Sequence, residues 1–159
     1  MNITVIAVGK LKEKYLKAGI AEYTKRLKPY CNLNIVEVAE EVIPESLSFA
    51  EKNQALRKEA SYILKKINPA SFVISLCIEG ERFTSEKMAK KIEGLMTSGT
   101  SHITFIIGSS LGLSDEVKEK AHLKLSFSDF TFPHQLMRLI LLEQIYRWFK
   151  IIRGETYHK

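Results

Sequence analysis

Three segments of the sequence place small, hydroxyl-bearing or aromatic residues directly after an apolar run of strand length. These segments are residues 76–80 (LCIEG), 108–112 (GSSLG) and 126–134 (SFSDFTFPH). Glycines let a backbone approach a ligand closely, and hydroxyls beside aromatic rings can bind a flat heterocycle. Strand-to-helix turns and packed loops use the same residues, so a purely structural role is the alternative. No Walker A loop or GxGxxG fingerprint opens a helix, which excludes the commonest nucleotide-binding sites.

Charged side chains of the last expected helix form a second group of candidates. His134 and Arg138 lie one helical turn apart near its start, where the helix dipole disfavours cations. They are either donors to a ligand, or a capping histidine and an arginine paired with a neighbouring acid. Glu143 and Arg147 have the spacing of an intrahelical ion pair, which predicts a structural role.

The C-terminal tail carries Arg153, Tyr157, His158 and Lys159. This mixture of cations and aromatic rings suits phosphate contact and base stacking, as in proteins that bind single-stranded RNA. Chain ends also fray commonly, so a disordered tail is the alternative.

The elements that must position these groups alternate along the chain. Apolar runs predict strands at residues 3–9, 33–38, 72–78, 103–108 and 123–127. Helical spacing predicts helices at residues 11–27, 49–67 and 85–96, a short one opening at Ser114, and a last one after Pro133 that extends to residue 152. Repeated β-α units indicate an α/β fold with a mainly parallel sheet flanked by helices. Ligands of such sheets bind beyond the carboxyl ends of the strands, where the three segments lie.

Two helices have an informative apolar pattern. The first places Leu11, Tyr15, Tyr23 and Leu27 on one predicted face. The last reads LMRLILLEQIYRWFKII over residues 136–152 and is apolar on more than one side. One sheet face cannot bury all of that surface, so we expect a second buried surface in a two-fold dimer.

Composition indicates an ordinary globular protein. The chain has 159 residues, 45% of them hydrophobic, and no linker or repeat, which predicts a single domain over residues 1–159. The net charge of +6 favours an anionic partner such as RNA or DNA without requiring one. Cys31 and Cys77 lack zinc-site or disulfide spacing. Because no run is long enough to span a membrane and the apolar start lacks a basic n-region, we expect a cytoplasmic protein without membrane or metal partners.

Several ordered motifs resemble one family from end to end. They are VIAVGKLKEKY near the start, IGSSLGL, SFSDFTFPHQLMR, LLEQIYR and the terminal RGETYHK. The chain resembles the ribosomal RNA large subunit methyltransferase H family, a minimal group of the SPOUT (α/β-knot) superfamily. The resemblance implies a SPOUT-type fold with a C-terminal trefoil knot, an exception to the rule that chains do not thread their own loops.

The resemblance also implies a ligand and a reaction. S-adenosyl-L-methionine is expected at Leu76, Gly108, Phe127, Ser128, Asp129, Phe130, Thr131 and Phe132, in an antiparallel homodimer that shares its active site. The implied reaction methylates N3 of a pseudouridine in 23S ribosomal RNA within the assembled ribosome. Two residues depart from the family pattern: Ser109 stands where a second glycine is usual, and Thr156 stands where proline is usual.

Methylation of N3 requires loss of the imide proton, and four residues are candidates for that chemistry. Either His158 removes the proton as a base, or Arg153 and Arg138 stabilise the developing anion, and Tyr157 can stack on the target base. Two other functions stay open. One is a basic RNA-binding or ribosome-associated factor without catalysis, and the other is a SPOUT enzyme acting on transfer RNA.

Overall fold

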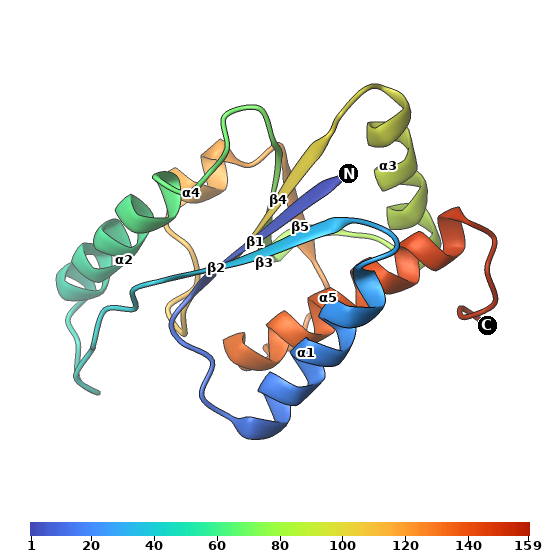
Figure 1. Ribbon diagram of the computed structural model, residues 1–159. Coiled ribbons are helices and arrows are strands. Elements are labelled where there is room, and N and C mark those ends of the chain that lie inside the picture. The colour runs from blue at the N-terminus through green and yellow to red at the C-terminus, as the bar shows by residue number, and fades with distance from the viewer.

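Strands and helices alternate along the whole chain in the computed structural model, which describes residues 1–159 (Figure 1). The strands are β1 (Asn2–Val8), β2 (Asn32–Val38), β3 (Phe72–Arg82), β4 (His102–Ile107) and β5 (Leu123–Ser126). The helices are α1 (Lys14–Leu27), α2 (Phe49–Leu64), α3 (Ser85–Thr97), α4 (Asp115–Lys120) and α5 (His134–Ile152). None of the helices combines the length and the apolarity needed to cross a bilayer.

The strands form one sheet in the order β2-β1-β4-β3-β5, and every pairing in it is parallel. Helices α1, α3 and α5 cover one face, and α2 and α4 cover the other (Figure 1). The α/β fold with a parallel sheet flanked by helices is therefore confirmed. The C-terminal trefoil knot is consistent with this strand order and stays a prediction.

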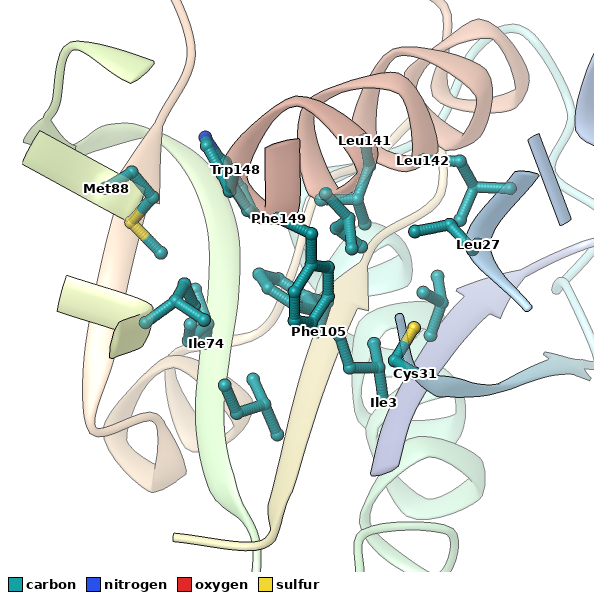
Figure 2. Close-up of a cluster of buried hydrophobic side chains, with 14 of the residues drawn as sticks. Ile3, Leu27, Cys31, Ile74, Met88, Phe105, Leu141, Leu142, Trp148 and Phe149 are labelled. Carbon is teal, nitrogen blue, oxygen red and sulfur yellow. The ribbon is translucent and has the colours of Figure 1, made fainter. Parts of the chain in front are cut away.

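Each face of the sheet has its own apolar core. On the larger side, Figure 2 shows Phe149 of α5 beside Phe105 of β4. The rings of Phe105 and Trp148 stack with centroids 6.0 Å apart. On the smaller side, Ile106 meets Ile63 of α2 and Val117 of α4. Burying one such side chain stabilises a fold by roughly 1.5–3 kcal/mol, so these contacts hold the helices on the sheet.

Helix α1 differs from the prediction in its start and its buried face. It begins at Lys14, because the backbone N–H of Leu11 donates to a carboxylate oxygen of Glu37 at 2.7 Å and holds that segment outside the helix. The buried side chains are those of Leu16, Ile20 and Leu27. Leu11 and Tyr23 also pack against the larger core, as predicted, whereas Tyr15 is 67% exposed, so its assignment to the apolar face is wrong.

Helix α5 is covered on several sides within the chain. It packs on β4 and is flanked by α1 and α3. Gly19 of α1 makes room for Leu139, because a Cβ atom at Gly19 would lie 2.9 Å from a methyl carbon of Leu139. None of the side chains of α5 is exposed. The prediction that one sheet face cannot bury this helix is right, but neighbouring helices supply the cover, so a dimer must be argued from other observations.

Strand β3 is longer than the apolar run that predicted it. Leu125 of β5 lies opposite both Leu76 and Glu81, so residues 77–80 leave the ladder between these two positions. Gly80 permits this path, because a Cβ atom there would lie 2.7 Å from the backbone of Lys124. The excursion turns Cys77, which is a free thiol, and its neighbours toward the carboxyl end of the sheet.

Candidate functional site

A cavity of about 300 Å³ opens at the carboxyl ends of the adjacent strands β3, β4 and β5. Its walls are the three segments singled out by their residue types, together with the start of α5. The lining residues are Leu76–Glu79, Ile107–Ser109, Leu111–Leu113, Lys118, Leu125–Ser128, Phe130–Phe132, His134 and Met137. All the residues predicted to bind a cofactor therefore lie together here, with the exception of Asp129.

The loop after β4 is shaped by its own backbone. A Cβ atom at Gly108 would lie 2.3 Å from the carbonyl oxygen of Gly112, and Gly112 has a φ of +82°. The N–H of Gly112 donates to the carbonyl oxygen of Ser109 at 2.9 Å and closes a turn. Gly108 is thus required by close approach within the loop, which supports the structural alternative that the sequence analysis left open beside ligand binding.

The segment after β5 forms a compact wall. The Ser126 hydroxyl donates to the carbonyl oxygen of Ser128 at 3.2 Å, and the Ser128 hydroxyl accepts from the N–H of Phe130 at 3.0 Å. Phe127 lies edge-on to Trp148, whereas Phe130 is largely exposed at the cavity rim. Asp129 points elsewhere and forms an exposed ion pair with Arg82.

Three ionisable side chains besides His134 line the cavity. Lys118 of α4 forms an ion pair with Glu79, and this hydrogen bond holds the pKa of the Glu79 carboxyl below its usual value. Burial raises the pKa of the Cys77 thiol. The sequence analysis included Glu79 in the 76–80 segment but did not select Lys118, because neither spacing nor residue type indicates that α4 and the β3 excursion meet at one cavity.

His134 begins α5 at the edge of the cavity. Its Nε2 atom is buried without a hydrogen-bond partner and lies 3.9 Å from a carboxylate oxygen of Glu40. Burial lowers the pKa of the His134 imidazole, and the Glu40 carboxylate opposes part of that effect. A neutral ring with an unused nitrogen is thus available at the cavity wall, where the sequence analysis expected either a ligand donor or a capping residue.

Arg138 is only 2% exposed and does not line the cavity. Its Nη1 donates to Glu37 at 2.6 Å, and its Nη2 donates to the carbonyl oxygens of Val8 at 3.1 Å and Gly9 at 2.7 Å. The ion pair offered as the structural alternative is therefore formed. These contacts give no support to Arg138 as a donor to the imide anion, because its terminal nitrogens already bind groups of its own chain.

The tail is ordered against α5 and α3. The Tyr157 hydroxyl donates to Glu143 at 3.1 Å, and the Arg147 guanidinium lies 4.8 Å from the centre of the Tyr157 ring. Glu143 and Arg147 form the predicted intrahelical ion pair at 2.6 Å. Burial, followed by hydrogen bonding to Tyr23 and Glu143, raises the pKa of Tyr157.

His158 and Arg153 also have partners in their own chain. His158 Nε2 lies 2.7 Å from Glu86, and its Nδ1 lies 3.2 Å from Arg147 Nη1. Because arginine can only donate, Nδ1 accepts and Nε2 carries the proton of the neutral ring. The Arg153 guanidinium donates to the carbonyl oxygen of Pro29 at 3.0 Å and lies 4.4 Å from the centre of the Tyr30 ring.

The cavity lies at the start of α5, whereas the tail leaves the other end of this helix and folds back onto Glu143 and Arg147 in its middle. His134 and Met137 line the cavity at the first turns of this helix, and the tail follows its last residue, Ile152. The 19 residues of α5 span about 28 Å at the usual rise. Figure 1 shows the C-terminus beyond the far end of the helix, and His158 of the tail contacts Glu86 of α3. The structure thus brings the cofactor candidates together but leaves Arg153, Tyr157 and His158 apart from them.

A parallel α/β sheet with a cavity at the carboxyl ends of three adjacent strands defines a ligand-binding α/β protein. The family model described as "Predicted SPOUT methyltransferase" matches residues 1–158 of the chain. The chain belongs to this SPOUT methyltransferase family.

Curated relatives match over the full length. A protein named ribosomal RNA large subunit methyltransferase H from Bacillus pumilus is 58% identical over 159 residues, covering 100% of both chains. A protein of the same name from Carboxydothermus hydrogenoformans is 60% identical with the same coverage. The resemblance proposed from the terminal and loop motifs is thereby confirmed.

A solved structure supports the fold independently. A "probable methylase family protein" from Haemophilus influenzae superposes with a TM-score of 0.52 at 16% identity, covering 99% of this chain and 70% of the other. At that identity the match is evidence for the fold alone.

Proposed function

We propose that this protein uses S-adenosyl-L-methionine to methylate N3 of a pseudouridine in 23S ribosomal RNA within the assembled ribosome, acting in the cytoplasm as a single-domain chain. The observation that carries the proposal is the cavity at the ends of β3, β4 and β5, in a chain that shares its whole length with relatives named as ribosomal RNA methyltransferases. The net charge of +6 favours an RNA substrate.

The cavity suits the proposed cofactor in size and chemistry. Its volume of about 300 Å³ lies at the lower end of the usual range for small-molecule sites. Apolar side chains such as Leu76, Phe127 and Met137 can flank a purine ring, while the turn of residues 109–112 offers backbone polar groups. When bound, S-adenosyl-L-methionine supplies an electrophilic methyl group that needs little activation.

The protein must then align the nucleophile and ease the loss of the imide proton. A gap of two to three pKa units between the imide and the ambient pH adds about 3–4 kcal/mol to the barrier. Two routes remain in this proposal: His158 accepts the proton, or Arg153 stabilises the anion while Tyr157 stacks on the base. Arg138 acts in this scheme by holding the end of β1, where it binds Val8 and Gly9.

We further propose a homodimer in which the tail of one chain completes the cavity of the other. The support is that Tyr157 and His158 bind Glu143, Arg147 and Glu86 of their own chain and line no part of its cavity, so the tail of one chain leaves its own cavity incomplete. An antiparallel two-fold arrangement places the end of one α5 near the start of the other.

The direct test is methyl transfer from labelled S-adenosyl-L-methionine to purified ribosomes and, in parallel, to protein-free ribosomal RNA and transfer RNA. We expect labelled N3-methylpseudouridine in the ribosome sample, identified by mass spectrometry of nucleosides. Cofactor binding without transfer to any RNA would favour the non-catalytic RNA-binding alternative. Transfer to transfer RNA alone would favour the other SPOUT activity.

A further inference from the structure

A buried carboxylate lies beneath the cavity loop. Glu59 of α2 is 2% exposed and forms no ion pair with any lysine, arginine or histidine. Its Oε1 accepts a hydrogen bond from the Ser109 hydroxyl at 2.8 Å. Its Oε2 accepts from the backbone N–H of Glu41 at 3.3 Å. One carboxylate thus holds two loops that follow different strands.

The Ser109 hydroxyl carries this contact into the cavity wall. It accepts from the N–H of Leu111 at 3.3 Å while donating to Glu59, and the carbonyl oxygen of Ser109 accepts from Gly112. Ser109, Leu111 and Gly112 all line the cavity. Ser109 is itself 6% exposed, so water cannot readily replace Glu59 as its acceptor.

The second oxygen of Glu59 fixes the neighbouring wall. Glu40 and Glu41 line a separate hollow of about 670 Å³, together with Gly9, Lys10 and Ser110. Ser110 belongs to the same loop as Ser109, so this loop separates the hollow from the cofactor cavity. Glu59 therefore sets the position of the loop relative to both spaces.

Burying a carboxylate without a cation costs stability, and burial raises the pKa of Glu59. The surrounding core is formed by aliphatic side chains such as Ala60 and Ile63, which pack without an acid. Buried charged groups without a counter-ion are concentrated at functional sites, where their role explains why the cost in stability is kept. The hydrogen bonds that Glu59 accepts from Ser109 and Glu41 indicate that this carboxylate holds two loops beside the cavity in place.

We propose that Glu59 and Ser109 form a positioning pair that holds the 108–112 loop in the conformation that binds S-adenosyl-L-methionine, and this inference rests on the proposed function. Ser109 stands where the family usually has glycine, so the loop can form without this hydroxyl. The hydroxyl adds hydrogen bonds that hold the loop more firmly in place. Removing the hydroxyl should therefore weaken cofactor binding severalfold without abolishing it.

The experiment measures cofactor affinity by titration calorimetry and the free energy of unfolding by urea for Ser109→Ala, for Glu59→Met, which has a similar length and no acceptor oxygen for the Ser109 hydroxyl, and for the double variant. We expect each single variant to bind S-adenosyl-L-methionine about five- to tenfold more weakly, the loss typical of one or two weakened hydrogen bonds. The double variant should bind S-adenosyl-L-methionine about as well as the single variant with the lower affinity, because both substitutions break the same hydrogen bond.

Ser71→Ala is the matched control. It removes a buried hydroxyl that accepts from Thr104 at 2.9 Å, in a pair that joins β3 and β4 away from the cavity. This variant should lower the free energy of unfolding without changing cofactor affinity. If folded Ser109→Ala and Glu59→Met bind as tightly as the unchanged protein, or if Ser71→Ala weakens binding equally, the inference is overturned.

Amide hydrogen exchange in the ligand-free protein separates this inference from the proposed function. Loss of the pair should accelerate exchange of the Leu111 and Gly112 amides in Ser109→Ala but not in Ser71→Ala. If the unchanged protein fails to bind S-adenosyl-L-methionine, the proposed function fails, yet these amides still report whether the pair positions the loop. Unaltered exchange would refute the positioning role. If Ser109→Ala does not fold, Ser109→Gly removes the same hydroxyl and takes its place in every measurement.

Discussion

Gly108 and Gly112 belong to one loop but are required for different physical reasons. At Gly108 an added Cβ atom would lie 2.3 Å from the backbone oxygen of Gly112. Because that oxygen belongs to the main chain, the clash is removed only by moving the loop, which costs stability. At Gly112 no atom lies within 4 Å of the added Cβ, and only the positive φ opposes a side chain. The distinction is invisible in the sequence, where both are simply small residues bracketing a loop.

Gly108→Ala should therefore destabilise the protein by about 2–3 kcal/mol, and Gly112→Ala by about 1 kcal/mol. Urea unfolding of both variants checks the order. Equal losses, or a larger loss at Gly112, would contradict the loop geometry. Because the clash at Gly108 lies inside the loop, we expect its variant to lose cofactor affinity together with stability and not selectively.

His134 should make stability depend on pH. Because burial lowers the pKa of its ring below the usual 6.5, the unfolded chain binds a proton at that site before the folded chain does. Stability should fall as the pH falls below about 6.5 and level off below the folded pKa. His134→Gln should remove this contribution to the pH dependence of the free energy of unfolding, which urea unfolding between pH 5 and 8 measures. Glu40→Gln should enlarge it, because the Glu40 carboxylate raises the pKa of His134.

At the scale of elements, α5 connects the two parts of the proposed site. Its first turns line the cavity, and its middle both fills the larger core and anchors the tail through Glu143 and Arg147. The tail is an ordered segment, since Tyr157 and His158 bind α5 and α3. The alternative of a disordered tail is therefore wrong.

Deleting residues 157–159 should lower the free energy of unfolding by about 1–2 kcal/mol, the usual size of a few half-buried hydrogen bonds and cation–π contacts. Cofactor affinity should stay unchanged, because none of these residues lines the cavity. Methyl transfer to ribosomes should be lost. Calorimetry, unfolding and the labelled-methyl assay on the same preparation measure all three, and full transfer activity in the shortened protein would refute a role for the tail.

At the scale of the whole molecule, the dimer rests on the tail lying outside the cavity of its own chain and not on uncovered apolar surface, because α1 and α3 already flank α5. Light scattering at micromolar concentration should give the mass of two chains. A stable monomer that methylates ribosomes would contradict the proposal that the site is shared.

A mixed dimer tests the sharing directly. One chain carries the 157–159 deletion, and the other carries Thr131→Trp, which fills the cavity from an exposed position at its wall. If tail and cavity come from different chains, the mixed dimer keeps one intact site and about half of the activity, whereas each homodimer is inactive. An inactive mixed dimer with normal cofactor binding would place tail and cavity in the same chain.

The sequence by itself determined the β-α alternation, the parallel α/β class, the serine that caps α4 and the three segments that meet at the cavity. These features follow from local spacing and from the rule that the carboxyl ends of parallel strands share one edge. Motifs in a fixed order along the chain were enough to indicate the family. None of these inferences requires knowing which distant residues touch.

Only the tertiary structure decided the roles of individual polar side chains. The partners of Arg138 lie 101 to 130 residues away, and Ser109 lies 50 residues from Glu59. The excursion of β3 and the exposed face of α1 likewise depend on neighbours that no local pattern contains. Periodicity reports which residues are apolar and at what interval, whereas a hydrogen bond or a clash depends on atoms that folding alone brings together.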